Sequence, residues 1–202
     1  MKNILILLIT LLPLSALAQF PTEQYKTDTV TWYGIDYTQC YMVGAEGFTN
    51  RKRIVQTYFD AWNEFVNTEP HKYDIPRYLI KPDIIIDLSL VHEKNVKLNP
   101  HGIVKSDVHK LTQTDVTALL AKYDFHEVGL GVMLFAEYYS KHDLEASYFF
   151  VVFDAQTKKI IRSRRYIQEP AGFGFRNFWA KTFYGSLKWM NKDIRKWLRQ
   201  RG

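Results

Sequence analysis

The sequence predicts a single mixed α/β (α+β) domain, in which helices cover a five-stranded mixed sheet. Runs of β-branched and aromatic residues have the length of strands, and two long apolar stripes recur at helical spacing. No repeat, low-complexity tract or Gly/Ser linker divides the chain, and its length suits one sizeable core. The predicted element order is β-α-β-α-β-β-β-α, ending in a long helix.

Residues 29–43 predict the first strand, because β-branched and aromatic types dominate them. Thr49 or Asn50 could cap the helix that follows, and Pro70 ends it. Its apolar side is formed by Ile54, Val55, Tyr58, Phe59, Trp62, Phe65 and Val66. A helix with one such side is expected to lie on a sheet.

Residues 83–91 alternate in the manner of a second strand. Residues 92–112 are polar and predict an irregular connection. Thr112 or Thr114 could then cap a short helix that runs to Tyr123.

Three consecutive strands predict an antiparallel meander. Residues 128–139 are apolar on both faces apart from one glutamate, which favours a central position in the sheet. Residues 146–153 and 160–167 follow, each after a short polar turn. Arg162 and Arg164 share one face of the last strand, as is typical of an edge.

A loop at residues 170–174 precedes the final helix, which we expect to have about 25 residues and a length of roughly 38 Å. Its apolar stripe consists of Trp179, Phe183, Leu187, Met190, Ile194, Trp197 and Leu198. Basic residues fill most of the remainder. The tryptophans of this end could dock the helix on its own sheet, or the basic face could lie on a membrane surface.

Residues 1–18 predict a cleavable secretory signal peptide. Lys2 precedes a short apolar run that is too short to span a bilayer, and Ala16 and Ala18 provide small residues for cleavage. Cleavage would leave residues 19–202 as the mature domain, in the periplasm or outside the cell. Cys40 is the only cysteine, so we expect a buried thiol in the first strand and no internal disulfide.

Charge is distributed unevenly along the chain, whose net charge is +6. Residues 158–201 hold thirteen Lys and Arg and only two acids, whereas residues 19–157 have a net charge of −6. This asymmetry favours an acidic partner, such as an envelope protein or an anionic lipid surface. Alternatively, the basic end rests against acidic parts of its own domain. Nucleic acid is not expected as the partner of an exported protein.

The start of the final helix is a candidate binding region. Gly172-Phe173-Gly174, followed by Arg176, could hold an anion at the helix N-terminus, or it could be a tight turn whose Phe173 and Phe175 fill the core. The full predicted binding set is Gly172, Gly174, Arg176, Asn177, Trp179, Lys188, Lys192 and Arg195.

Acidic residues within apolar strands are the alternative site. Asp36 and Glu137 have apolar neighbours, and burial of an unpaired carboxylate is costly. Either they form structural ion pairs with Arg162, Arg165 or Arg176, or Asp36, Glu137 and Arg176 line the cleft of a hydrolase or small-ligand binder.

Motifs for metal or cofactor chemistry are not found in the sequence. The six histidines lack metal-ligand spacing, no nucleophile elbow occurs, and Gly129-x-Gly131 lies inside a predicted strand. We therefore expect no cofactor and no metal, and a non-enzymatic role is favoured over catalysis.

Three local patterns together carry a family resemblance. They are Trp32-x-Gly34-x-Asp36, then Ala61-Trp62-Asn63 with Glu69-Pro-x-Lys72-Tyr-Asp74, and finally Gly172-Phe-Gly-x-Arg176-Asn177-Phe178-Trp179. On these the chain resembles a family of uncharacterised exported proteins of Bacteroidetes-type bacteria. The resemblance implies export and brings no activity, so it assigns no catalytic residue.

Overall fold

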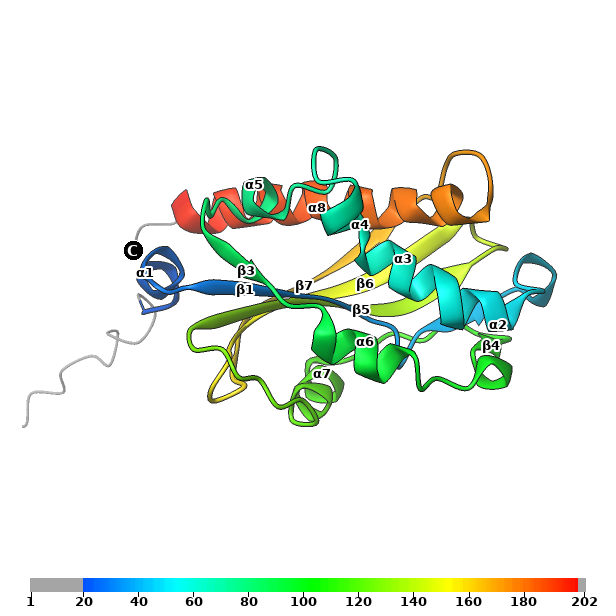
Figure 1. The fold of residues 1–202 in the computed structure, drawn as a ribbon, viewed down its shortest axis with the longest axis horizontal. Coiled ribbons are helices and arrows are strands. Elements are labelled where there is room, and N and C mark those ends of the chain that lie inside the picture. Colours follow the sequence, from blue (N-terminus) through cyan, green and yellow to red (C-terminus); the bar gives the residue numbers. More distant parts are fainter. Residues whose placement is uncertain (1–19, 200–202) are drawn as a thin grey trace, which may run out of the picture.

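Strand β5 (Leu130–Ser140) is the centre of the sheet in the computed structural model, which describes residues 20–199 (Figure 1). One edge of β5 pairs in parallel with β1 (Val30–Asp36) and then with β2 (Tyr41–Val43). The other edge pairs antiparallel with β6 (Glu145–Asp154), which pairs with β7 (Ile160–Gln168). All of β5 is buried, so its predicted central position and the predicted meander are both confirmed.

The predicted first strand is interrupted. Asp36 pairs with Phe135 and Tyr41 with Tyr138, so residues 37–40 form an insertion between β1 and β2. Cys40 is buried, as expected, but it lies in this insertion and not in a strand.

The outer edges of β1 and β2 carry two short parallel strands, β3 (Ile84–Ile86) and β4 (Val104–Lys105). The predicted number of five strands is therefore wrong, because the sheet has seven. They lie in five rows, since β1 and β2 share one row beside β5 and β3 and β4 share the next. The domain is α/β, and its sheet is mostly parallel.

The predicted strand 83–91 is wrong in its second half. Asp87 accepts hydrogen bonds from the backbone N–H and the hydroxyl of Ser89, and this turn starts helix α6 (Ser89–Asn95). Val91 then packs against β1 as part of a helix. The connection that follows contains the short helix η3 (Pro100–Gly102) and β4.

One layer of helices consists of a long interrupted helix, α5 and α8 (Figure 1). Asn50 caps the interrupted helix by accepting a hydrogen bond from the N–H of Arg53, as predicted. Its segments are α2 (Arg51–Arg53), the π-helical turn η2 (Ile54–Tyr58), α3 (Phe59–Asn63) and α4 (Phe65–Thr68). Helices α5 (Ile75–Leu79) and α8 (Phe175–Arg199) complete this layer.

The opposite layer consists of α6 and α7 (Gln113–Leu120) (Figure 1). Thr112 caps α7 through a capping box with Asp115, which confirms the predicted start. Two apolar cores result, one on each face of the sheet: the α8 side includes Trp32, Trp62 and Trp179, and the α7 side includes Tyr33 and Phe135.

Helix α1 (Phe20–Thr27) lies at one end of the sheet and was not predicted, because its sequence is polar and contains proline. The predicted signal peptide, residues 1–18, lies outside the described residues. Within residues 20–199, no helix combines the length and the apolar character needed to cross a bilayer.

Candidate functional site: the outer face of helix α8

Helix α8 has two chemically different sides. The predicted apolar stripe is buried against the sheet, and Trp179, Phe183 and Leu187 are at most 1% exposed. With 25 residues, α8 has a length of roughly 38 Å. Such strong segregation fixes the orientation of the helix, because rotation would expose the apolar side.

The opposite side of α8 presents six exposed cationic side chains, which we name the basic stripe. They are Lys181, Lys188, Lys192, Arg195, Lys196 and Arg199. The intervals from Lys181 through Lys188, Lys192 and Arg195 to Arg199 are seven, four, three and four residues. Such intervals bring these side chains to one side of a helix. The stripe therefore points away from the sheet.

No carboxylate of α8 lies within the basic stripe. The only acid of the helix, Asp193, accepts a hydrogen bond from the hydroxyl of Tyr166 at 2.9 Å and lies 3.5 Å from Nε of Arg164. Among residues 20–199, the ion pairs do not include any member of the stripe. Arg164, Arg165 and Arg176 of the basic end do have carboxylate partners, so the described domain pairs part of this end and leaves the stripe without an ion pair.

Aromatic side chains accompany the stripe. Nζ of Lys192 lies 4.2 Å from the ring centre of Trp189, and Nζ of Lys188 lies 4.2 Å from that of Tyr184. Trp189 is 49% exposed, whereas Trp197 is buried. One tryptophan therefore docks the helix and the other remains at the surface.

The loop before α8 agrees only in part with the expectation of a tight turn whose two phenylalanines fill the core. Phe175 packs on Phe48 and Tyr58, with ring centres 6.0 and 5.0 Å away, so it fills the core as one alternative expected. Phe173 does not fill the core, since it is 96% exposed. Gly172 and Gly174 have φ angles of 117° and 75°, a region that favours glycine, and they turn the chain so that Phe173 points outward.

The predicted binding set is divided by the structure. Trp179 is buried beside Phe48 and Tyr139, so it cannot contact a partner. Arg176 lies over the ring of Phe65, and its backbone oxygen accepts a hydrogen bond from the indole of Trp62 at 2.9 Å. Trp179 and the backbone of Arg176 anchor α8, whereas the side chain of Arg176 is 43% exposed and lies 4.0 Å from Glu69.

The other members of the predicted binding set are exposed. They are Gly172, Gly174, Asn177, Lys188, Lys192 and Arg195. Lys181, Lys196 and Arg199 extend the stripe and were absent from the predicted set, although their spacing along the helix would have placed them on it.

Asp36 is buried on the α7 side of the sheet. Its Oδ1 accepts a hydrogen bond from the N–H of Thr38 at 2.6 Å, and its Oδ2 accepts one from the hydroxyl of Tyr123 at 2.7 Å. Burial raises the pKa of Asp36, and these hydrogen bonds oppose the rise. Both carboxylate oxygens are thus occupied within the domain.

Glu137 forms a buried ion pair with Arg165 on the same side of the sheet. It lies at the β-bulge between Ala136 and Tyr138, and its two oxygens accept hydrogen bonds from Nε and Nη2 of Arg165, both at 2.8 Å. The N–H of Leu111 and the hydroxyl of Ser147 also donate to it. The hydrogen bonds with the Glu137 carboxylate raise the pKa of Arg165.

The alternative cleft is not formed by the described residues. Asp36 and Glu137 are 1% and 0% exposed and have partners on the α7 side, whereas Arg176 belongs to α8 on the opposite face. The ion-pair interpretation with Arg165 accounts for Glu137, as one alternative expected.

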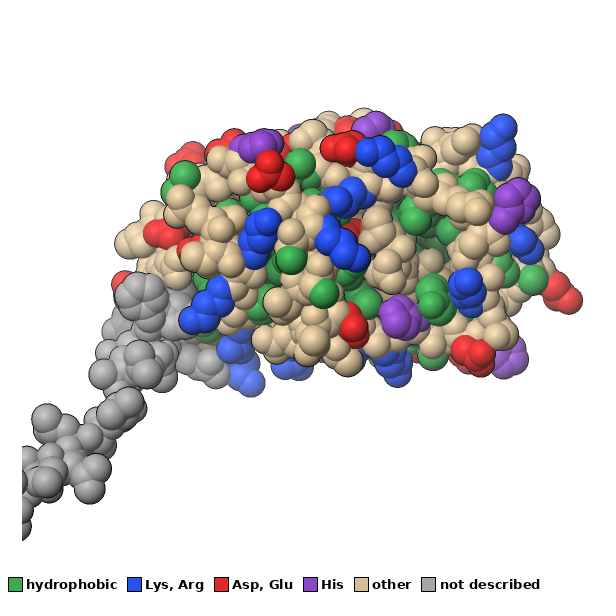
Figure 2. Space-filling view, turned by 90° about the horizontal axis from the view of Figure 1, so that it is seen from below, with side chains coloured by type: hydrophobic (Ala, Val, Ile, Leu, Met, Phe, Trp, Pro, Cys, Tyr) green, Lys and Arg blue, Asp and Glu red, His purple; other side chains and the backbone are tan. Residues whose placement is uncertain are grey.

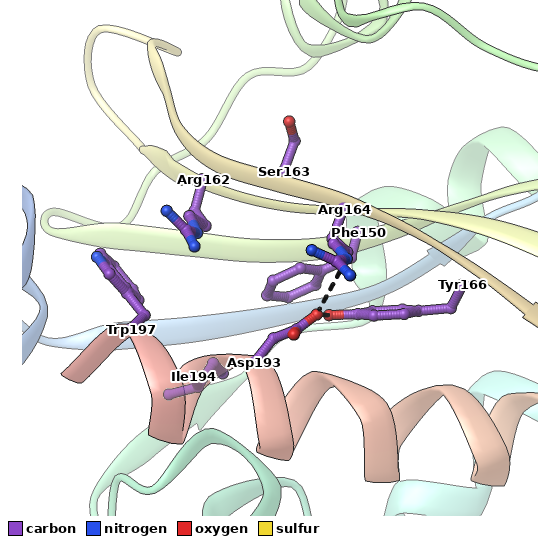
Figure 3. Close-up of a pocket in the computed structure, with 8 residues that line it drawn as sticks. All are labelled: Phe150, Arg162, Ser163, Arg164, Tyr166, Asp193, Ile194 and Trp197. Atoms are coloured by element: carbon purple, nitrogen blue, oxygen red, sulfur yellow. Dashed lines mark hydrogen bonds and ion pairs between the residues drawn. The ribbon is translucent and has the colours of Figure 1, made fainter. Parts of the chain in front are cut away.

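A small pocket lies between β7 and α8 (Figure 3). Arg162, Arg164, Tyr166, Asp193 and Trp197 contribute to its wall, and its volume is about 40 Å³. A space of this size has room for ordered water.

The α6 and α7 face contrasts with the stripe. Figure 2 shows basic and acidic side chains interspersed on this face and histidines that lie apart from one another. Among the described residues, no group of three or more His, Cys, Asp or Glu is arranged to hold a metal ion.

The three sequence patterns of the family resemblance meet in the structure. A Cβ atom on Gly34 would lie 2.7 Å from Oδ1 of Asn63, and Trp62 binds the backbone of Arg176. These patterns therefore explain packing between β1, α3 and α8. No protein-family model and no curated protein matches the chain, so the resemblance stays a prediction.

Proposed function

We propose that the chain is an exported, non-enzymatic envelope protein that binds an acidic surface through the basic stripe of α8. The observation that carries the proposal is the set of six exposed cations on one side of a helix, without an ion pair among the described residues. Aligned like charges repel one another and lower the stability of the isolated domain. An acidic partner would remove that repulsion.

Two further observations support binding rather than catalysis at this domain. Asp36 and Glu137, the carboxylates predicted to line a cleft, have hydrogen-bond partners inside the domain. The pocket of Figure 3 is small, with a volume of about 40 Å³. The export part of the proposal rests on residues 1–18, whose sequence has the order of a signal peptide.

The test uses residues 19–202, which contain every described helix and strand, because the apolar run before them would itself bind lipid. Two probes are compared: polyglutamate, an acidic polypeptide, and vesicles with about 30% phosphatidylglycerol. Lys188→Ala, Lys192→Ala and Arg195→Ala are combined in the stripe variant. We expect the wild-type domain to bind at least one probe and the stripe variant to bind it about 100-fold more weakly, since each cation near an anionic surface contributes about 1 kcal/mol.

A matched control removes the same number of charges from the α6 and α7 side. Lys97→Ala, Lys110→Ala and Lys122→Ala change three exposed lysines there. If this control weakens binding as much as the stripe variant does, net charge rather than the stripe governs binding, and the proposal is wrong. It is also wrong if the wild-type domain binds neither probe.

A further inference from the structure

We infer that the acidic surface is an anionic lipid bilayer and that Phe173 is the side chain that enters it; this inference rests on the proposed function. The first observation is the near-complete exposure of Phe173, at 96%. An isolated apolar side chain on a surface is common, but here the adjacent glycines hold a whole ring away from the domain. A flexible polar residue would serve a simple turn equally well.

The second observation is the position of this loop. The segment between β7 and α8, drawn in orange, projects beyond α8 on the side away from the sheet (Figure 1). The basic stripe lies on that same outer side of the helix. A flat surface that touches the stripe would therefore also meet the loop.

The third observation joins the loop to the helix. A surface hollow is lined by Pro170 and Ala171 of the loop and by Lys181 and Trp189 of α8. Glu169 also lines it and is the one carboxylate there. Trp189, which is 49% exposed, thus shares this hollow with the loop and with Lys181, where an amphipathic ring suits a lipid headgroup region.

The composition of the stripe favours lipid over a protein partner. Four of its six cations are lysines, and lysine is depleted from protein–protein interfaces. From Lys181 to Arg199 the stripe extends about 27 Å along a straight helix. Such a long row of flexible cations can contact several anionic headgroups of one flat bilayer surface. The exposed ring of Phe173 adds the apolar contact that interfacial binding requires.

The experiment uses residues 19–202 and compares two exposed apolar residues that lie beyond opposite ends of the central strands. Phe173→Ser is the test variant, and Val128→Ser, at a site 64% exposed before β5, is the control. Partitioning onto vesicles with about 30% phosphatidylglycerol is measured for both. We expect Phe173→Ser to weaken partitioning about tenfold and Val128→Ser to leave it unchanged.

A second readout reports insertion itself. Phe173→Trp should retain binding, and lipids brominated in the acyl chains should quench its additional fluorescence relative to the wild-type domain. If vesicles bind but Phe173→Ser binds like wild type and the new tryptophan is not quenched, insertion is refuted while the proposed function stands. If polyglutamate binds and vesicles do not, the bilayer is refuted in favour of an acidic protein. If neither probe binds, the proposed function fails as well.

Discussion

The side chain of Asn63 hydrogen-bonds to the backbone of Ile35 as a neighbouring strand would. Oδ1 accepts from the N–H of Ile35 at 2.7 Å, and Nδ2 donates to the carbonyl of Ile35 at 3.0 Å. Strand β3 ends at Ile86, so the outer edge of β1 has no strand partner at this point. Asn95, from the other helical layer, donates to the same carbonyl and accepts from the N–H of Tyr37.

We therefore expect Asn63→Ala to lower the free energy of unfolding by about 1–3 kcal/mol, because it leaves the buried N–H of Ile35 without a partner. Asn67→Ala, an exposed position on the same interrupted helix, is the matched control and should change stability by less than about 0.5 kcal/mol. Urea denaturation of residues 19–202 measures both. Equal effects of the two variants would show that Asn63 does not replace a strand.

The ion pair of Glu137 and Arg165 gives a second prediction. Arg165→Met leaves the Glu137 carboxylate buried without its cation, and we expect a loss of about 3–5 kcal/mol in the free energy of unfolding. Arg164→Met removes a neighbouring arginine whose side chain is 64% exposed, and should cost less than about 1 kcal/mol.

Combining Arg165→Met with Glu137→Gln should recover part of the loss, since a neutral amide can still accept the hydrogen bond of Leu111. Thermal or urea unfolding of the three variants provides the comparison. The ion-pair account is contradicted if the double variant is no more stable than Arg165→Met.

Asp36 gives a prediction for pH. Burial raises its folded-state pKa above the ordinary value of 3.8, so this group stabilises the fold at pH values below 3.8. That contribution is lost as the pH rises from 3.8 through the raised folded-state pKa, because the unfolded chain then releases its proton more readily.

In Asp36→Asn the amide oxygen can still accept the hydrogen bond from the N–H of Thr38, and the amide nitrogen can donate one to the hydroxyl of Tyr123. The amide cannot ionise. We expect this variant to lose less stability than the wild-type domain as the pH is raised, measured by urea denaturation at a series of pH values. Identical pH dependence in the two proteins would mean that the carboxyl of Asp36 titrates normally.

Much of the fold could be predicted from the sequence because local signals and burial agree there. Strands β5 and β6 are long runs of mostly apolar residues that are buried on both faces, and the apolar stripe of α8 recurs at helical spacing over 25 residues. Strands β3 and β4 have three and two residues, which is too short for any period. The sequence of residues 83–91 is compatible either with one long strand or with a strand followed by a helix after Asp87. The hydrogen bond between Ser89 and Asp87 forms the turn that starts the helix, and the sequence pattern does not show it.

The site was partly predictable for a similar reason. Charge and spacing placed Lys188, Lys192 and Arg195 on one helical side, and that side is exposed. Trp179 was placed both in the apolar stripe and in the binding set, and its burial agrees with the stripe alone. The sequence could not indicate that Phe173 points out, because that outcome depends on the glycine conformations of the loop. Nor could it pair Glu137 with Arg165 rather than with the other arginines, since the pairing depends on strand register.

The most direct test of the central claim is the salt dependence of binding to anionic vesicles. Binding of residues 19–202 is measured at about 50 mM and about 200 mM salt for the wild-type domain, the stripe variant and the control that lacks Lys97, Lys110 and Lys122. The account predicts strong binding at low salt that falls steeply at high salt for wild type and control, and weak binding with little salt dependence for the stripe variant. Binding that is equally strong in all three proteins, or independent of salt, would contradict a function based on the basic stripe of α8.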